Sequence, residues 1–167
     1  RDYAVTGVQT CALPIFGVAA SLACPGRTVV VATGDGAFGF NAMEIDSAVR
    51  HRAPVLIVVA NNGSWAIEVR DQQETHGKVV GTHLQFADHA AMARAFNMHA
   101  ERVEQAEQLD GAIARALAEL RAGRPALLDV VVTPEAASSD AKSGLAWVPD
   151  LQALGAWDEA ERKWRGR

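Results

Sequence analysis

Two short polar motifs, each placed directly after an apolar β-branched run, constrain the fold of this chain more than any other feature. Residues 28–33 (TVVVAT) lead into Gly-Asp-Gly at positions 34–36, and residues 55–60 (VLIVVA) lead into Asn-Asn at positions 61–62. Both runs have the length and composition of strands that are buried on both faces of a parallel sheet. We therefore expect an α/β fold in which polar groups follow two neighbouring strands.

The segment between the two motifs is predicted to be a helix. Residues 38–52 show helical spacing, with Phe40, Met43 and Ala48 among the apolar positions. The unit then runs strand, turn, helix, strand, and such a crossover brings the carboxyl ends of both strands to the same edge of the sheet. The two polar motifs should meet at that edge.

The groups that meet there suit a metal-bridged diphosphate. Asp35 offers a carboxylate and Asn62 a neutral amide, and Mg²⁺ is commonly held by one or two such oxygen ligands together with phosphates and water. Gly34 and Gly36 leave room for close backbone approach, and a helix that starts near Ala37 would offer unpaired N–H groups to a phosphate. Gly-Asp-Gly alone would indicate only a turn.

The strand context and the spacing of the two motifs resemble the binding motif for thiamine diphosphate (ThDP). The resemblance implies the diphosphate-binding domain of a ThDP-dependent enzyme, with ThDP and Mg²⁺ as cofactors. It implies metal ligation by Asp35, Asn62 and the backbone carbonyl of Ser64, whereas Asn61 either ties down the turn after the strand or touches the diphosphate. The predicted cofactor-binding residues are Gly34, Asp35, Gly36, Ala37, Asn62, Ser64, Trp65 and Ile67.

Residues 63–83 are polar and rich in hydrogen-bonding side chains, and we expect a long functional loop there. In the resembled enzymes this segment covers the cofactor and contributes to the substrate pocket. Trp65 is either a pocket residue or an anchor that packs the loop onto the surface. His76 and His83 are either proton-transfer groups or solvent-facing side chains. The predicted pocket-lining residues are Trp65, Ile67 and Glu68.

The rest of the chain up to residue 133 is predicted to be scaffold. We expect a helix over 88–96 with an acidic cap, a short strand over 100–103, an amphipathic helix over 106–121 and a buried strand over 126–132. Asp129 in the last strand is expected to be a structural, hydrogen-bonded residue. The predicted fold class is α/β, with three α/β/α layers around a mostly parallel sheet.

Within the ThDP enzymes, residues 34–62 are most similar to the branch of acetolactate synthases, oxalyl-CoA decarboxylases and 2-hydroxyacyl-CoA lyases. The wording AFGFNAMEI at 37–45 slightly favours the acyl-CoA enzymes. The resemblance implies a parent that is a carbon–carbon lyase or decarboxylase for 2-hydroxyacyl-CoA or 2-oxo acid substrates; an acetolactate synthase-like carboligase is the alternative. It also implies a homodimer or homotetramer.

The resemblance further implies that part of the catalytic apparatus lies elsewhere. The glutamate that activates the cofactor belongs to a separate pyrimidine-binding domain, which has no counterpart in this sequence, so no catalytic residue is assigned here. The bulky residue that supports the bent cofactor would fall near Thr10, which does not match. We therefore expect the 167-residue chain alone to be inactive.

Composition is consistent with an enzyme domain but also leaves a non-catalytic Mg²⁺- and phosphate-binding regulatory module open. With 49% hydrophobic residues the chain can bury one core, and its net charge of −4 with dispersed basic residues argues against nucleic acid. No apolar run approaches the roughly 18 residues of a membrane span, so no membrane partner is expected. Cys11 and Cys24 show no metal or disulfide pattern, which favours the cytoplasm. A nicotinamide site would need G-x-G-x-x-G, which is absent.

The two ends differ from the central domain, predicted over residues 16–133. Residues 1–15 resemble the translation of sequencing-adapter read-through and are expected to be a non-native leader; an ordinary strand and turn is the alternative. Residues 134–167 are predicted to form a linker and a helix with an apolar stripe. That helix either packs on the domain or forms a lid with Lys142 or Arg162 facing substrate phosphates. The stripe consists of Leu154, Trp157, Ala160 and Trp164.

Overall fold

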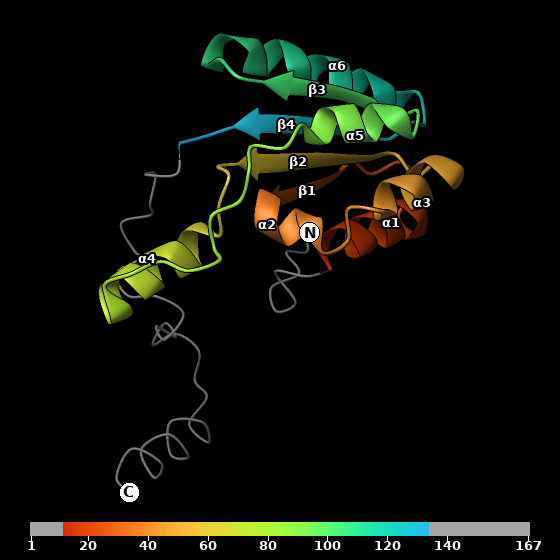
Figure 1. The fold of residues 1–167 in the computed structure, drawn as a ribbon. Helices are drawn as coiled ribbons and strands as arrows, with labels where there is room; N and C mark the ends of the chain where they lie inside the picture. The colour runs from red at the N-terminus through yellow and green to blue at the C-terminus, as the bar shows by residue number, and fades with distance from the viewer. Residues whose placement is uncertain (1–11, 134–167) are drawn as a thin grey trace, which may run out of the picture.

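The computed structural model describes residues 12–133, drawn as coloured ribbon in Figure 1. Predictions for the linker and C-terminal helix, including Lys142 and Arg162, concern residues outside this range. The first described helix begins at Leu13, three residues before the expected domain boundary, and Pro14 in its first turn is buried. The non-native origin of residues 1–15 stays a prediction.

A four-stranded parallel sheet forms the centre of the described domain. Its strands are β1 (Val29–Gly34), β2 (Val55–Asn61), β3 (His99–Val103) and β4 (Ala126–Val131), in the order β1-β2-β4-β3. All three strand pairs are parallel. The predicted strands are confirmed, and all four carboxyl ends lie at one edge of the sheet, on the left in Figure 1.

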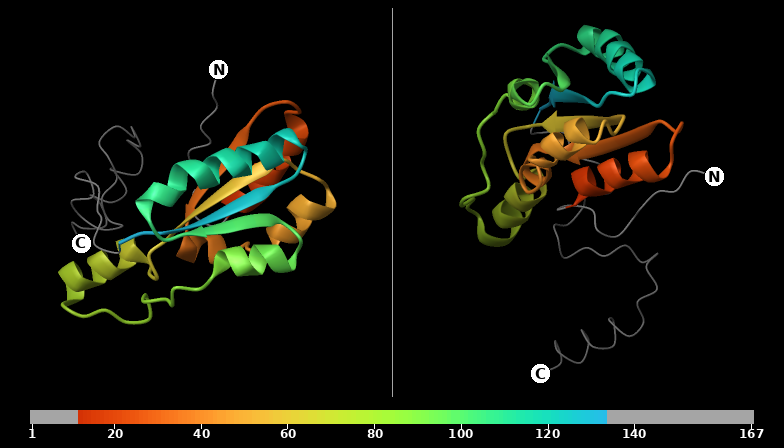
Figure 2. Two further views of the ribbon diagram at one scale, coloured as in Figure 1. Left: turned by 90° about the horizontal axis from the view of Figure 1, so that it is seen from above. Right: turned by 90° about the vertical axis from the view of Figure 1, so that its right-hand side faces the viewer.

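Helices cover both faces of the sheet, which confirms the three-layer α/β/α class (Figures 1 and 2). Side chains alternate between the two faces of each strand. One face packs against four helices through a core that includes Phe38, Ile57 and Leu127. The other face packs Leu56 and Leu128 against a single amphipathic helix. The helices are α1 (Leu13–Ala23), α2 (Asp35–Gly39), α3 (Glu44–Arg50) and α5 (His89–Ala95) on the first face, and η1 (Ala106–Gln108) leading into α6 (Leu109–Arg121) on the second. Within residues 12–133, no helix is long and apolar enough to cross a membrane.

The single helix predicted over 38–52 is wrong, because the chain forms two helices there. Gly34 is extended and α2 starts directly at Asp35, then ends after five residues. Tight backbone bonds at Phe40 and Asn41 turn the chain before α3 begins. Of the apolar positions named for that helix, Ala48 is buried, whereas Phe40 and Met43 are 59% and 63% exposed. Phe38 and Ile45 are the other buried apolar side chains of this segment.

The prediction of a continuous loop over 63–83 is also wrong, since it contains the helix α4 (Ala66–His76). Gly77 closes this helix in the left-handed conformation, with φ of 65°. The residues of α4 include several good helix formers but lack an apolar period, because the helix projects beyond the carboxyl ends of the strands and covers little of the core (Figure 1). His76 and His83 are both exposed.

Candidate functional site

The sheet edge at the carboxyl ends of β1 and β2 holds a cavity of about 380 Å³. The structure brings all the predicted cofactor and metal residues together around it, and Glu68 from α4 joins them. The βαβ argument thus placed the two motifs correctly with respect to each other. The roles of the individual residues stay predictions.

Asp35 provides a buried carboxylate with one free oxygen. Its residue surface is only 4% exposed, and the carboxylate accepts from the backbone N–H groups of Gly36 and Gly63. Its Oδ2 atom has no hydrogen-bond partner in the described structure. Burial raises the pKa of this carboxyl above its ordinary value, although the backbone N–H groups of Gly36, Gly63 and Asp35 itself and an electrostatic interaction with His89 oppose the shift. A buried anion with an unsatisfied oxygen is a site that a cation would stabilise.

Asn62 points its side-chain oxygen into the turn that leads to α4. Asn62 Oδ1 accepts from the backbone N of Ser64 at 3.1 Å and from Ser64 Oγ at 3.2 Å. Gly63 makes this turn possible because its φ of 64° lies in the left-handed region. An amide oxygen has two lone pairs. A metal at Asn62 Oδ1 must therefore replace at least one of the two bonds from Ser64.

Asn61, the first residue of the second motif, is fully buried and structural. Its Nδ2 atom donates to the carbonyl of Ala87 at 2.8 Å and to Asp129 Oδ1 at 2.9 Å. It therefore ties the end of β2, where the turn begins, to β4 and to the segment before α5. Asp129 is fully buried and hydrogen-bonded, which confirms its structural assignment.

Trp65 forms one wall of the cavity. A Cβ atom added to Gly36 would lie 2.7 Å from Trp65 Cδ2 and Cε2, so the indole packs directly on the Gly-Asp-Gly turn. The ring of Phe40 meets Trp65 edge-on, with centroids 5.4 Å apart. Trp65 is thus both a cavity residue and an anchor of its segment, while Ile67 is 61% exposed.

Three contributors to the site escaped the sequence analysis. Gly63 supplies an N–H group to Asp35, His89 interacts electrostatically with the Asp35 carboxyl, and Phe40 contacts Trp65. The only sequence signal for Gly63 is its place directly after Asn62, where a left-handed residue suits a turn. His89 lies 54 residues from Asp35 in sequence, a difference of 89 − 35, and gives no local signal.

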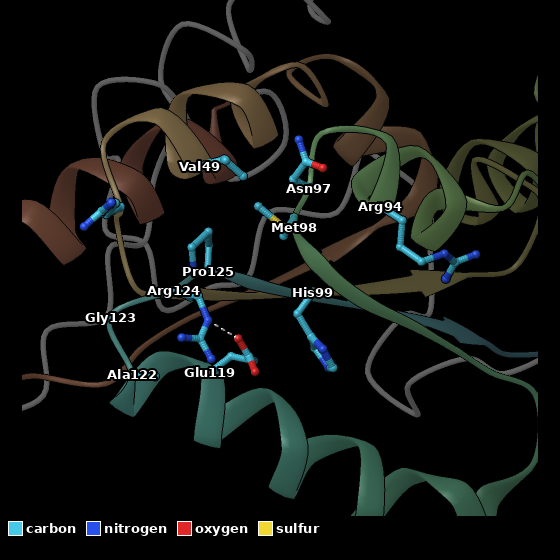
Figure 3. A pocket seen from close by; sticks show the side chains of 11 residues that line it. Val49, Arg94, Asn97, Met98, His99, Glu119, Ala122, Gly123, Arg124 and Pro125 are labelled. Carbon is cyan, nitrogen blue, oxygen red and sulfur yellow. Dashed lines mark hydrogen bonds and ion pairs between the residues drawn. The ribbon is translucent and has the colours of Figure 1, made fainter.

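A larger cavity, of about 860 Å³, lies at the opposite edge of the sheet between α3, α5 and α6 (Figure 3). Of the arginines at this cavity, Arg94 lies in the last turn of α5, where a positive charge complements the helix dipole, and Arg52 and Arg124 follow the C-terminal ends of α3 and α6. Arg124 binds Glu119 at 2.5 Å and Arg94 donates to a backbone carbonyl at 3.1 Å. Arg94 and Arg124 thus have partners within the described domain, and no residue lining this cavity has an unpartnered buried oxygen like that of Asp35, so the smaller cavity at Asp35 remains the candidate site.

Comparison with known families identifies the family of the domain. Residues 3–130 match the family described as thiamine pyrophosphate enzyme, C-terminal TPP binding domain, where thiamine pyrophosphate is another name for ThDP. The chain belongs to this family. The match begins inside the segment that was expected to be a non-native leader.

The ThDP-enzyme domain is similar to several characterised proteins. It is 38% identical over 125 residues to a probable acetolactate synthase of Mycobacterium bovis, covering 74% of this chain and 22% of that protein. It is 32% identical over 133 residues to a 2-hydroxyacyl-CoA lyase of Oryza sativa subsp. japonica, covering 76% and 22%. A solved structure, the ThDP-dependent 4-hydroxybenzoylformate decarboxylase of Rhodococcus jostii RHA1, superimposes with a TM-score of 0.61 at 29% identity, covering 70% of this chain and 21% of that chain. The chain spans about a fifth of the length of these relatives.

The donor set at the cavity fits the ion that would accompany a diphosphate. Residues 12–133 contain no cluster of three His, Cys, Asp or Glu side chains of the kind that holds zinc or iron. They offer instead one carboxylate, one amide oxygen and the nearby backbone of Ser64. This sparse oxygen set suits Mg²⁺, which keeps water and phosphate oxygens among its ligands.

Proposed function

We propose that the cavity between β1, β2 and α4 binds the diphosphate of ThDP through a Mg²⁺ ion. The observation that supports this most directly is the unpartnered Oδ2 atom of the buried Asp35. In this proposal Asp35 is the charged metal ligand, and Asn62 Oδ1 and the Ser64 carbonyl are neutral ligands. Because α2 has only five residues, its dipole is small, and the metal provides most of the attraction for the diphosphate.

The other residues of the cavity would shape the cofactor site. Gly34 lets the diphosphate approach the backbone closely, because a Cβ atom there would meet nothing within 4 Å, whereas Gly36 leaves room for the Trp65 indole. Trp65 and Ile67 would contact the part of the cofactor or substrate beyond the diphosphate. When bound, ThDP would supply a thiazolium carbon that adds to the substrate carbonyl and an electron sink for the carbanion that is left when the neighbouring carbon–carbon bond is broken. The glutamate that activates the cofactor would come from the pyrimidine-binding domain of the parent.

For the parent, we propose a ThDP-dependent lyase or decarboxylase that acts on 2-hydroxyacyl-CoA or 2-oxo acid substrates. The similarity to a 2-hydroxyacyl-CoA lyase and the resemblance to a solved decarboxylase support this class. An acetolactate synthase-like carboligase is the second candidate, favoured by the 38% identity to the Mycobacterium bovis protein.

We also propose that the parent is a cytoplasmic homodimer or homotetramer. Exposed apolar side chains beside the cavity support an interface there, because large apolar groups that cluster on a surface commonly mark contacts with another chain or domain. The pyrimidine-binding domain is the partner proposed for this surface. The exposed residues are Phe40, which contacts Trp65, Ile67, which lines the cavity, and Phe86, which packs on Gly63.

Metal binding by the 167-residue chain tests whether the cavity at Asp35 is a metal site. Mn²⁺ is used in place of Mg²⁺ as a paramagnetic probe, and pyrophosphate stands in for the diphosphate of the cofactor. ¹⁵N NMR then records which backbone amide signals broaden. We expect broadening at Gly36, Gly63 and Ser64, and sharp signals at Asn97 and Gly123 beside the opposite cavity. Broadening confined to the opposite edge, or none at all, contradicts the proposal.

The same titration separates a ThDP site from a regulatory metal site. A diphosphate site requires that pyrophosphate and ThDP strengthen Mn²⁺ binding, because metal and phosphate oxygens share ligands. A non-catalytic module that senses Mg²⁺ alone predicts the same Mn²⁺ affinity with and without either compound.

A further inference from the structure

We propose that the buried ion pair between Asp129 and Arg102 positions the metal site, by holding the Asn61–Gly63 turn in the geometry that Asp35 requires. The inference rests on the proposed function, since it assigns a role in metal binding to residues that do not line the cavity. We use "Asp129 network" for the contacts among Asp129, Arg102, Asn61, the Ala87 carbonyl and the His89 backbone N–H group.

Asp129 is satisfied on both of its oxygen atoms, although it has no exposure to solvent. Oδ1 accepts from Asn61 Nδ2 at 2.9 Å, and Oδ2 accepts from Arg102 Nη1 at 2.8 Å and from the backbone N of His89 at 3.1 Å. Asp129 therefore joins three separate segments: the end of β2, the middle of β3 and the start of α5.

The Ala87 carbonyl is the second acceptor of the network. It accepts from Asn61 Nδ2 at 2.8 Å and from Arg102 Nη1 at 2.9 Å, so the same two donors contact both Asp129 and Ala87. Arg102 also forms an ion pair with Glu104 at 2.8 Å. Because the Glu104 side chain is exposed, water screens that ion pair. The pair of Arg102 with Asp129 is the one in which an oxygen is fully buried.

From Ala87 the contacts continue to Asp35. Phe86, next to Ala87, packs on Gly63: a Cβ atom at Gly63 would lie 2.9 Å from Phe86 Cε2. The backbone N of Leu84 donates to the Gly63 carbonyl at 2.7 Å. Gly63 in turn donates its own N–H group to the Asp35 carboxylate. The Asp129 network thus reaches the proposed metal ligand through one continuous series of contacts.

Stability alone does not explain an ion pair at this place. Leu127, two residues earlier on the same face of β4, packs in the apolar core, and an apolar residue at position 129 could continue that packing. Replacing a buried ion pair with apolar residues is often neutral or stabilising. What an apolar residue cannot do is fix Asn61 and the Ala87 carbonyl by directed hydrogen bonds. Outer-shell partners of metal ligands are known to act in this way.

The test compares two ion pairs that each include one residue of β3. Arg102→Met removes the charge and the bonds of the network while keeping an apolar stem. Arg115→Met is the matched control, because Arg115 forms a two-pronged pair with Glu101 at 2.9 and 2.7 Å between β3 and α6, and contacts no residue of the network. Both variants are made in the 167-residue chain, and Mn²⁺ affinity with pyrophosphate is measured well below the melting temperature of each.

We expect Arg102→Met to raise the Kd for Mn²⁺ by about tenfold or more, the range found for lost outer-shell partners, and Arg115→Met to change it by less than about twofold. Asp129→Asn, which preserves the shape of the side chain, should behave like Arg102→Met and replaces it if that variant does not fold. An unchanged Kd in a folded Arg102→Met or Asp129→Asn variant overturns the inference.

Amide hydrogen exchange in the metal-free chain provides a second readout that does not depend on the proposed function. The exchange of the Gly63 N–H group should accelerate about tenfold in Arg102→Met and remain unchanged in Arg115→Met, because only the first loosens the turn locally. If the wild-type chain fails to bind Mn²⁺ with pyrophosphate, the proposed function is refuted by that result alone. Unchanged Gly63 exchange in Arg102→Met refutes the positioning role in either case.

Discussion

Asp35→Asn should make the metal-free chain more stable while removing its affinity for metal. The carboxylate of Asp35 is almost fully buried, and its Oδ2 atom has no partner. Asparagine has nearly the same shape, can still accept from the N–H groups of Gly36 and Gly63 through its oxygen, and brings no charge. The structure therefore predicts opposite effects on stability and on binding, which a purely structural Asp35 would not produce.

The size of the stability gain follows from the buried atom. An unsatisfied buried polar group costs roughly 1–3 kcal/mol. The amide group introduced by Asp35→Asn would leave its own N–H groups without partners at the same place, so we expect a gain near the lower limit, about 1 kcal/mol. For a domain of this size that raises the melting temperature by roughly 2–4 °C. Loss of a direct charged ligand should weaken Mn²⁺ binding beyond the roughly 10- to 100-fold effect of outer-shell changes.

The stability difference between Asp35→Asn and wild type should depend on pH in a known direction. Because burial raises the pKa of Asp35, the folded chain binds this proton more tightly than the unfolded chain does. Asp35 therefore destabilises the fold progressively as pH rises from the ordinary carboxyl pKa of about 3.9 to the raised pKa of the folded state. The difference in melting temperature between Asp35→Asn and wild type should be largest at neutral pH and should vanish below that window.

Thermal melts monitored by circular dichroism, run over a range of pH with and without Mn²⁺ and pyrophosphate, measure the change in stability, its pH dependence and the loss of metal binding. Ligands should raise the melting temperature of the wild type but not that of Asp35→Asn, because a ligand stabilises only a fold that binds it. Asp110→Asn is the control, since Asp110 is an exposed carboxylate in the first turn of α6. A lower melting temperature for metal-free Asp35→Asn, together with retained Mn²⁺ binding, would refute the reasoning.

The other predictions concern neighbouring residues and the chain as a whole. Asn62→Ala should weaken Mn²⁺ binding less than Asp35→Asn does, because a neutral oxygen contributes less attraction; equal losses in isothermal titration would contradict this. Gly36→Ala should destabilise the wild type, and Trp65→Ala should relieve most of that loss, since the added Cβ meets the indole; thermal melts of the double-mutant cycle should give a coupling of roughly 1–3 kcal/mol. Finally, the 167-residue chain should release no product from 2-oxo acids or 2-hydroxyacyl-CoA with ThDP and Mg²⁺, and turnover above a protein-free control would place the activating group within this chain.

The part of the fold that sequence reasoning predicted well is the part that local patterns determine. Strands β1, β2 and β4 are continuous apolar runs, and such runs are typical of parallel strands buried on both faces. The crossover rule then places their carboxyl ends together without further information. For the same reason Asp35 and Asn62 were predicted to lie at one cavity, as they do.

The errors occur where local pattern and tertiary context disagree. Residues 38–52 contain enough apolar positions for one helix, but the turn after Gly39 interrupts it and leaves Phe40 free to contact Trp65. Helix α4 escaped prediction for the opposite reason. It lacks an apolar stripe because it contributes little to the core, so the main sequence signal for a helix is missing.

The Asp129 network shows a third limit, which concerns the register of the sheet. Asp129 is a single acidic residue in an apolar strand, and the sequence indicates only that it needs a partner. Which partner it finds depends on strand order: β4 lies between β2 and β3, in register with Arg102 on one side and close to Asn61 on the other. Parallel strands far apart in sequence give no local signal for such an arrangement. A site built from motifs on β1 and β2 can therefore depend on residues of β3 and β4 that no motif contains. Substitutions at Arg102 or Asp129 should change metal binding although neither residue lines the cavity.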